Sequence, residues 1–207
     1  MCESFSENEQ RAAFKIRNLG TVANDKIILG VDPGTSLMGY GIIKVSGKNT
    51  DMLNMGIIRL NKLETHSERL ARIFSRVTGI IEEYRPEIMA IEAPFFGKNV
   101  QSMLKLGKAQ GVAIAAALNA KVAYEEYAPR RIKQSITGNG NASKEQVAAM
   151  LQSIFKIKEM PKDLDATDGL AVALCHHFSS GKLGNNGKSF SGWGAFVKSQ
   201  GHRVVKK

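Results

Sequence analysis

Apolar and polar positions follow two patterns along this chain: short apolar runs, and longer stretches with helical spacing. Residues 26–31 form an apolar run that ends in the turn residues Asp32-Pro33-Gly34, a pattern typical of a central strand buried on both faces. Residues 64–84 carry apolar side chains three and four positions apart and stop before Pro86, which predicts an amphipathic helix. The same reasoning predicts the remaining elements, which are strands at 39–45, 52–60, 88–91 and 122–126 and helices at 100–118, 143–155 and 165–178.

Alternating strands and helices predict an α/β fold, and we expect one domain over residues 27–180. Residues 1–26 are polar and lack a sustained apolar period, so we expect a poorly ordered N-terminal extension. Residues 181–207 are rich in Gly, Ser, Asn and Lys and carry six basic and no acidic residues, which predicts a flexible basic C-terminal tail. This tail is either an arm that contacts nucleic acid or a solvated appendage, and its composition fits both.

The charge balance favours a polyanionic partner, because 29 Lys and Arg residues face 19 Asp and Glu residues, a net charge of +10. No apolar run is long enough to span a membrane, and the first residues lack the pattern of a signal peptide. We therefore expect a cytoplasmic protein with no membrane partner. Cys2 and Cys175 are too few and too far apart for a disulfide framework or a zinc site, so both are interpreted as reduced thiols.

Two acidic residues follow buried strands directly: Asp32 after residues 26–31, and Glu92 after residues 88–91. Acidic side chains are rarely buried without a partner or a metal ion. If the two strands are parallel neighbours, their carboxyl ends bring both carboxylates to one edge of the sheet. The alternative is that Asp32 only begins a turn and Glu92 only caps a loop.

Asp165 and Asp168 are three positions apart on a predicted helix and therefore share one face. That face continues through Ala171, Val172 and Cys175, which are apolar or small, so both acids lie on the side expected to pack against the sheet. Acids in a first helical turn also complement the helix dipole. The dipole explains their position along the helix but not their choice of face.

Four clustered carboxylates repel one another, so such a cluster requires protonation or bound cations. Oxygen ligands without His or Cys select Mg²⁺, with Mn²⁺ as a substitute. We expect two Mg²⁺ ions per active site, an arrangement that activates water and stabilises the leaving oxygen in phosphodiester hydrolysis. The predicted catalytic and metal-binding residues are Asp32, Glu92, Asp165 and Asp168.

Six motifs in order resemble those of the RuvC-type Holliday junction resolvases over about residues 27–178. They are Ile28-Leu-Gly-Val-Asp-Pro-Gly-Thr35, Gly39-Tyr-Gly41, Ala90-Ile-Glu-Ala-Pro-Phe95 with Lys98-Asn99, Leu106-Gly-Lys-Ala-Gln-Gly111, Lys133-Gln-Ser-Ile-Thr-Gly-Asn-Gly140 and Asp165-Ala-Thr-Asp-Gly-Leu-Ala171. The resemblance implies a ribonuclease H-like fold, a five-stranded mixed sheet flanked by helices. It also places the family's acidic tetrad on the four carboxylates named above.

The same resemblance implies a homodimer that cuts two like strands of a four-way DNA junction symmetrically, in recombination and DNA repair. It implies a branch-migration complex of the RuvA and RuvB type as a partner, and a bacterial, nucleoid-associated location. Phe95 matches an aromatic residue that stacks on a base at the junction, although a core phenylalanine would fit its composition too.

Four lysines are the further candidates for DNA contact: Lys133 and Lys144 near the scissile phosphate, with Lys98 and Lys108. Ser143 and Gln146 form a capping-box pattern, which puts Lys144 at a helix N-terminus where N–H groups favour a phosphate. A solvated surface position is the alternative for each lysine. Gln110 departs from the resemblance, because relatives often carry Arg there.

Three rival functions remain open: another ribonuclease H-like nuclease, an ATPase of the actin-like superfamily, and a junction-binding protein without catalysis. The chain is short for the two-lobed body of the ATPases, and the complete set of four carboxylates disfavours a protein that only binds. Cleavage of a synthetic four-way junction in Mg²⁺ distinguishes these possibilities.

Overall fold

The computed structural model describes residues 25–94, 99–161 and 163–180. The predictions for Phe95 and Lys98, for the C-terminal tail and for residues 1–24 of the N-terminal extension concern positions outside the described residues. The first strand begins at Asp25, two residues before the domain boundary expected from the sequence. Among the described helices, none combines the length and apolar character needed to cross a membrane.

One five-stranded sheet forms the centre of the molecule, with strand order β3-β2-β1-β4-β5. The strands are β1 (Asp25–Asp32), β2 (Leu37–Ser46), β3 (Asn49–Arg59), β4 (Ile88–Glu92) and β5 (Ala123–Tyr127). β1, β2 and β3 pair antiparallel, whereas β4 lies parallel to both β1 and β5. The predicted five-stranded mixed sheet is therefore confirmed.

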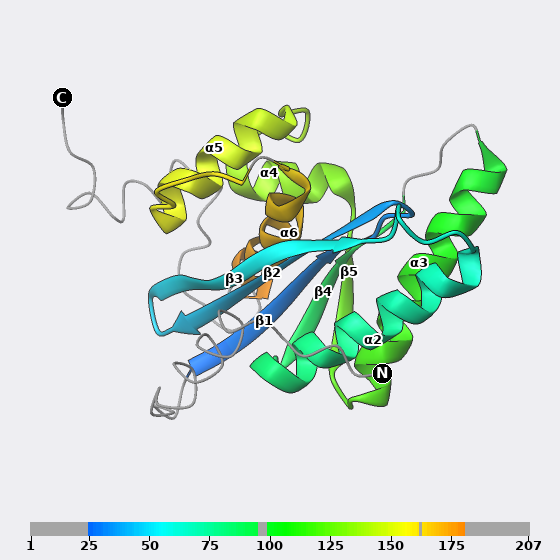
Figure 1. Cartoon of the computed structure of the whole chain (residues 1–207). Coiled ribbons are helices and arrows are strands. Elements are labelled where there is room, and N and C mark those ends of the chain that lie inside the picture. The colour runs from blue at the N-terminus through cyan, green and yellow to red at the C-terminus, as the bar shows by residue number, and fades with distance from the viewer. Residues whose placement is uncertain (1–24, 95–98, 162, 181–207) are drawn as a thin grey trace.

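Helices cover both faces of this sheet (Figure 1). They are α2 (His66–Tyr84), α3 (Val100–Asn119), α4 (Pro129–Thr137), α5 (Lys144–Phe155) and α6 (Asp165–Ser180). α2 and α3 pack together on one face, while α6, with α4 and α5, covers the other. Two apolar cores result: Leu29 and Val31 of β1 belong to the α2–α3 side, and Ile28 belongs to the α6 side. Burial on both faces explains why β1 is apolar from Ile27 to Val31, directly before Asp32.

Most helix ends follow from local sequence. The predicted capping box of Ser143 and Gln146 begins α5, and a second box of Thr65 and Glu68 begins α2. α4 was not predicted. It has nine residues and only two buried anchors, Ile132 and Ile136, so it offers too few apolar positions to establish a helical period.

α6 lies unusually close to β1 and β2, because glycines line the contact. A Cβ on Gly39 would collide with the carbonyl oxygen of Asp165, and a Cβ on Gly41 would collide with the backbone of Leu170. On the helix itself, a Cβ on Gly169 would collide with the backbone of Tyr40. Backbone therefore packs on backbone, and the first turn of α6 is held at the level of the sheet.

We predict that Gly169→Ala destabilises the domain by roughly 1–3 kcal/mol, because the new methyl group forces α6 away from β2. Gly79→Ala is the matched control: Gly79 is also helical, on α2, and its Cβ position is open. This control should stabilise the domain by up to about 1 kcal/mol through helix propensity. Urea denaturation measures both changes. A wild-type urea midpoint for Gly169→Ala would show that this contact does not set the spacing between helix and sheet.

Candidate active site

The carboxyl ends of β1 and β4 bring two of the predicted acids together. The two strands are parallel neighbours, with Val31 aligned to Ile91, so Asp32 and Glu92 follow at adjacent positions of the same sheet edge. From the sequence we expect both carboxylates at one sheet edge if their strands are parallel neighbours, and β1 and β4 are such neighbours. The carboxylates interact electrostatically, since the charge of Glu92 raises the pKa of Asp32.

α6 contributes the other two acids from its first turn. The close contact of Gly39 with Asp165 anchors this turn beside the beginning of β2. The hydroxyl of Thr167, a fully buried residue, donates a hydrogen bond of 2.6 Å to the carbonyl oxygen of Leu164 and fixes the start of the helix. Asp165 and Asp168 both interact with Asp32, so all four predicted acids belong to one electrostatic cluster.

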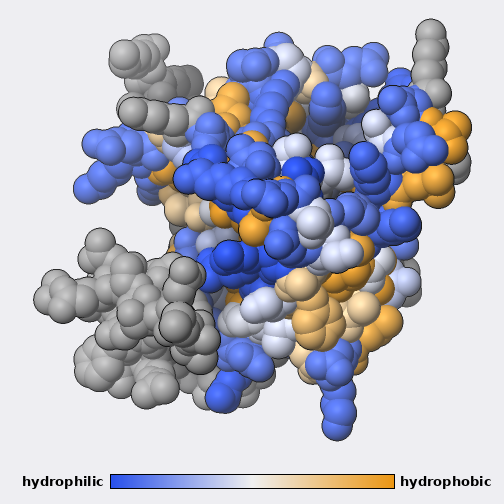
Figure 2. Space-filling model, turned by 45° about the vertical axis from the view of Figure 1, so that its right-hand side comes forward, coloured by the Kyte–Doolittle hydropathy of each residue, from blue (hydrophilic) through white to orange (hydrophobic). Residues whose placement is uncertain are grey.

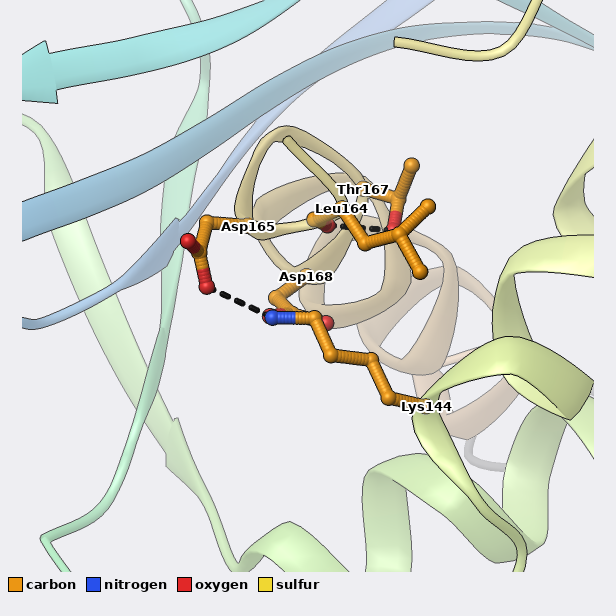
Figure 3. Close-up of polar contacts among 5 residues, drawn as sticks. All are labelled: Lys144, Leu164, Asp165, Thr167 and Asp168. Atoms are coloured by element: carbon orange, nitrogen blue, oxygen red, sulfur yellow. Dashed lines mark hydrogen bonds and ion pairs between the residues drawn. The ribbon is translucent and has the colours of Figure 1, made fainter. Parts of the chain in front are cut away.

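Lys144 reaches into this cluster from the first residue of α5 (Figure 3). Its Nζ lies 2.6 Å from Oδ1 of Asp165 and 2.7 Å from Oδ2 of Asp168. The lysine is therefore not a freely solvated surface residue. It supplies a cation between the two acids of α6.

Desolvation and mutual repulsion disfavour the ionised forms of these acids, which raises their pKa values. Burial, followed by the charges of Glu92 and Asp168, raises the pKa of Asp32 to about 8. Burial and the charge of Asp168 raise the pKa of Glu92 to about 7, with Lys133 and Lys144 opposing the shift. The pKa of Asp168 is also raised by burial, despite its ion pair with Lys144. A site with these properties favours an added cation.

A cavity of about 170 Å³ opens beside these acids. Its lining residues are Asp32, Glu92, Asp168, Lys133, Lys144, Pro129, Ile132, Val147 and Ala171. Acidic groups and two lysines around one cavity suit a phosphate held against metal-binding carboxylates. The structure thus places Lys133 and Lys144 with the predicted acids, although they come from separate helices, α4 and α5.

Lys108 and Gln110, both on α3, differ in burial and in their contacts. Lys108 is exposed and is absent from the residues that line the cavity. Gln110 is buried, and its Nε2 donates to Oε2 of Glu126 at 3.0 Å and to the carbonyl oxygen of Glu92 at 3.4 Å. Gln110 therefore links the ends of β4 and β5 from inside the fold.

His176 of α6 is a functional candidate that the sequence analysis did not identify, and the structure buries it. Its Nδ1 lies 2.9 Å from the hydroxyl of Tyr127, the last residue of β5. Helical spacing carried the signal, because His176 lies four and eight positions after Val172 and Asp168, on the stripe that packs against the sheet.

The donor set fits a hard divalent cation, because Asp32, Glu92 and Asp168 are half-buried carboxylates whose pKa values are raised by desolvation and mutual repulsion. Within the described ranges, no three His, Cys, Asp or Glu side chains are spaced to hold a metal ion. The ammonium of Lys144 is bound to Asp165 and Asp168 in this arrangement.

Comparisons with known proteins identify the family to which this chain is similar. The model of the family described as crossover junction endodeoxyribonuclease RuvC matches residues 28–176. The RuvC of Porphyromonas gingivalis is 58% identical over 184 residues, which cover 87% of this chain and 97% of that protein. The RuvC of Cytophaga hutchinsonii is 57% identical over 180 residues, covering 87% of this chain and 88% of the relative.

Among solved structures, Thermus thermophilus RuvC in complex with a Holliday junction substrate matches with a TM-score of 0.70 and 35% identity, covering 75% of this chain and 94% of that one. These matches define the fold as ribonuclease H-like, as predicted. The chain belongs to the RuvC family of crossover junction endodeoxyribonucleases. The family resemblance inferred from the six motifs is thereby confirmed.

We predict that Asp32→Asn stabilises the metal-free protein at alkaline pH. The folded protein raises the pKa of Asp32 from 3.8 to about 8, so ionising this carboxyl costs stability progressively as the pH rises through that window. The amide avoids this cost, and we expect a gain of about 1–3 kcal/mol at pH 8 that shrinks toward pH 4. Urea denaturation in EDTA at several pH values measures it. A gain that does not vary with pH would contradict the electrostatic origin.

Proposed function

We propose that this protein is a structure-specific endonuclease that resolves four-way DNA junctions by paired, symmetric hydrolytic nicks. One observation carries the proposal: half-buried acids from β1, β4 and α6 line the same cavity as lysines from α4 and α5, in a chain of the RuvC family. The solved structure of Thermus thermophilus RuvC with a Holliday junction substrate, at 35% identity, supports junction DNA as the ligand.

Asp32, Glu92, Asp165 and Asp168 are the proposed holders of two Mg²⁺ ions, with Mn²⁺ as a substitute. The bound ions would supply Lewis-acid stabilisation of the scissile phosphate and of the leaving oxygen. The high pKa values of Asp32 and Glu92 support this assignment, because such carboxylates gain most from a nearby cation.

The two lysines of the cavity have distinct proposed roles. Lys133 lines the same cavity as the acids, and its proposed role is to hold a phosphate oxygen of the strand to be cut. Lys144 holds Asp165 and Asp168 together before substrate binds, and it then turns to the phosphate, favoured there by the N-terminus of α5. DNA contacts by Lys108, Lys98 and Phe95 remain predictions from the family resemblance.

A homodimer is the second part of the proposal, because two symmetric nicks require two sites. α3 carries an exposed apolar stripe with Val100 66% exposed, Leu104 57% and Leu118 55%. Gly107 and Gly111 lie on the same stripe, and a Cβ at either would meet nothing within 4 Å. Figure 2, which turns the side of α2 and α3 forward, shows hydrophobic groups at the surface there. Small residues between apolar ones suit the close crossing of two copies of α3 about a two-fold axis.

The proposed setting is recombination and DNA repair in the bacterial cytoplasm and nucleoid. There the protein would act with a branch-migration complex of the RuvA and RuvB type. This setting follows from membership in the family, whose relatives are bacterial.

Cleavage of a synthetic four-way junction in Mg²⁺ tests the catalytic proposal. We expect paired nicks at symmetric positions on a denaturing gel, and a loss of at least about 100-fold in rate for Asp32→Asn and for Glu92→Gln with junction binding retained. Glu126→Gln is the matched control. Glu126 lies on β5 opposite Ile91, next to Glu92, but its carboxylate accepts a hydrogen bond from Gln110 and it does not line the cavity. Binding without cutting by the native chain would exclude catalysis, and full activity in Asp32→Asn would exclude the site assignment.

Leu104→Glu tests the dimer. A charge buried in the proposed α3–α3 contact should shift the protein from dimer to monomer in analytical ultracentrifugation, weakening association at least about tenfold. Gln134→Glu adds the same charge to an exposed position of α4, on the other face of the sheet, and should leave the dimer intact. A dimer that persists unchanged in Leu104→Glu would rule out this face.

A further inference from the structure

A buried polar contact joins β5 to α6, the helix that carries two of the proposed catalytic acids. The hydroxyl of Tyr127, at the end of β5, lies 2.9 Å from Nδ1 of His176 on α6, and their rings meet edge to face. Tyr127 is 2% exposed and His176 is 6% exposed; both lie among apolar side chains, and Oε2 of Glu125 lies 3.4 Å from the same Nδ1. Burying these polar groups is unfavourable unless they are hydrogen-bonded, so their contact favours one relative placement of β5 and α6.

α4 begins immediately after Tyr127 and depends on it for anchorage. Its N-cap residue, Ala128, provides no side-chain hydrogen bond, and Pro129 occupies the first turn. The guanidinium of Arg131 lies 5.4 Å above the ring of Tyr127 and donates a hydrogen bond of 3.1 Å to the hydroxyl of Ser179 on α6. One face of this short helix is therefore tied to the second half of α6.

The opposite face of α4 carries Lys133, two positions after Arg131, and Lys133 lines the cavity with Asp168 of α6. The charge of Lys133 acts on the acids, since it lowers the pKa of Glu92 against the larger effect of burial. Apolar contacts through Ile132 and Ile136 hold α4 on the core, but such contacts are not directional. The hydrogen bond between Tyr127 and His176 orients the ring on which Arg131 of α4 lies, and it thereby adds a directional restraint.

We propose that Tyr127 and His176 are positioning residues for the nuclease reaction: their hydrogen bond sets the distance from Lys133 on α4 to the acids of α6. This inference rests on the proposed function for its catalytic consequence, but its mechanical part stands on the geometry alone. Burial lowers the pKa of His176 against the opposing charge of Glu125, which favours a neutral ring. In the tautomer that carries its proton on Nε2, Nδ1 accepts the hydrogen bond from the Tyr127 hydroxyl.

The test compares Tyr127→Phe with Tyr124→Phe, the same change on an exposed tyrosine of the same strand. Under single-turnover conditions with enzyme in excess over a four-way junction, Tyr127→Phe should cut about tenfold more slowly with junction affinity changed less than about twofold. Tyr124→Phe should cut at the wild-type rate. Wild-type cleavage by Tyr127→Phe would overturn the proposal.

A double-mutant cycle separates positioning from general loss of stability. If Tyr127 acts through Lys133, then Tyr127→Phe should slow cleavage no further in a Lys133→Ala background. Multiplication of the two effects would overturn the proposal. His176→Asn retains a polar atom near the place of Nδ1 and should recover part of the rate lost in His176→Leu.

Hydrogen exchange provides a readout that does not depend on cleavage. Tyr127→Phe should speed amide exchange several-fold within residues 129–137, with α5 and the first turn of α6 unchanged. Unchanged exchange in α4 would overturn the mechanical part even if the wild-type protein failed to cut. Failure of the wild-type protein to cut, with faster exchange in the variant, would instead overturn the proposed function and leave the restraint established.

Discussion

Contact between the backbones of α6 and the β1–β2 pair determines where the functional groups of this domain lie. Gly39, Gly41 and Gly169 let the helix rest on the strands without an intervening layer of side chains. The first turn of α6 consequently stands beside the ends of β1 and β4. Asp165 and Asp168 reach the acids of the sheet because this contact leaves so little space between the layers.

The same closeness creates an electrostatic conflict within the folded protein. Carboxylates that are both buried and close together are stable as neutral acids, which is why the pKa values of Asp32 and Glu92 rise so far. Lys144 relieves part of the conflict through ion pairs of 2.6 Å and 2.7 Å to Asp165 and Asp168. Packing elsewhere in the fold outweighs the remaining repulsion, an arrangement typical of sites kept for function at the expense of stability.

Much of this arrangement could be predicted from the sequence, because strong local patterns carried it. The apolar run before Asp32, the run before Glu92 and the apolar stripe below Asp165 and Asp168 each reported burial directly. Whether β1 and β4 were parallel neighbours could not be read from local pattern. It depended on a pairing between segments about sixty residues apart, which the family resemblance supplied.

The features that sequence reasoning missed depend on partners distant in the chain. α4 has too few apolar positions to produce a helical period, and it forms because Ile132 and Ile136 find a core already present. Gln110 is polar in sequence but buried in structure, because Glu126 and the backbone of Glu92 complete its hydrogen bonds. His176 likewise requires Tyr127 for its burial to be understood.

The distribution of the acids along the chain makes folding itself a control on activity. Asp32 comes from the first strand of the domain, and Asp165 and Asp168 come from its last helix, so no partial fragment contains a complete site. Among the described elements α6 comes last in the chain, and its docking on the sheet joins the two ends of the described fold. A fragment that stops before α6 therefore lacks Asp165 and Asp168, so the acidic cluster forms only once the whole domain has been made and has folded.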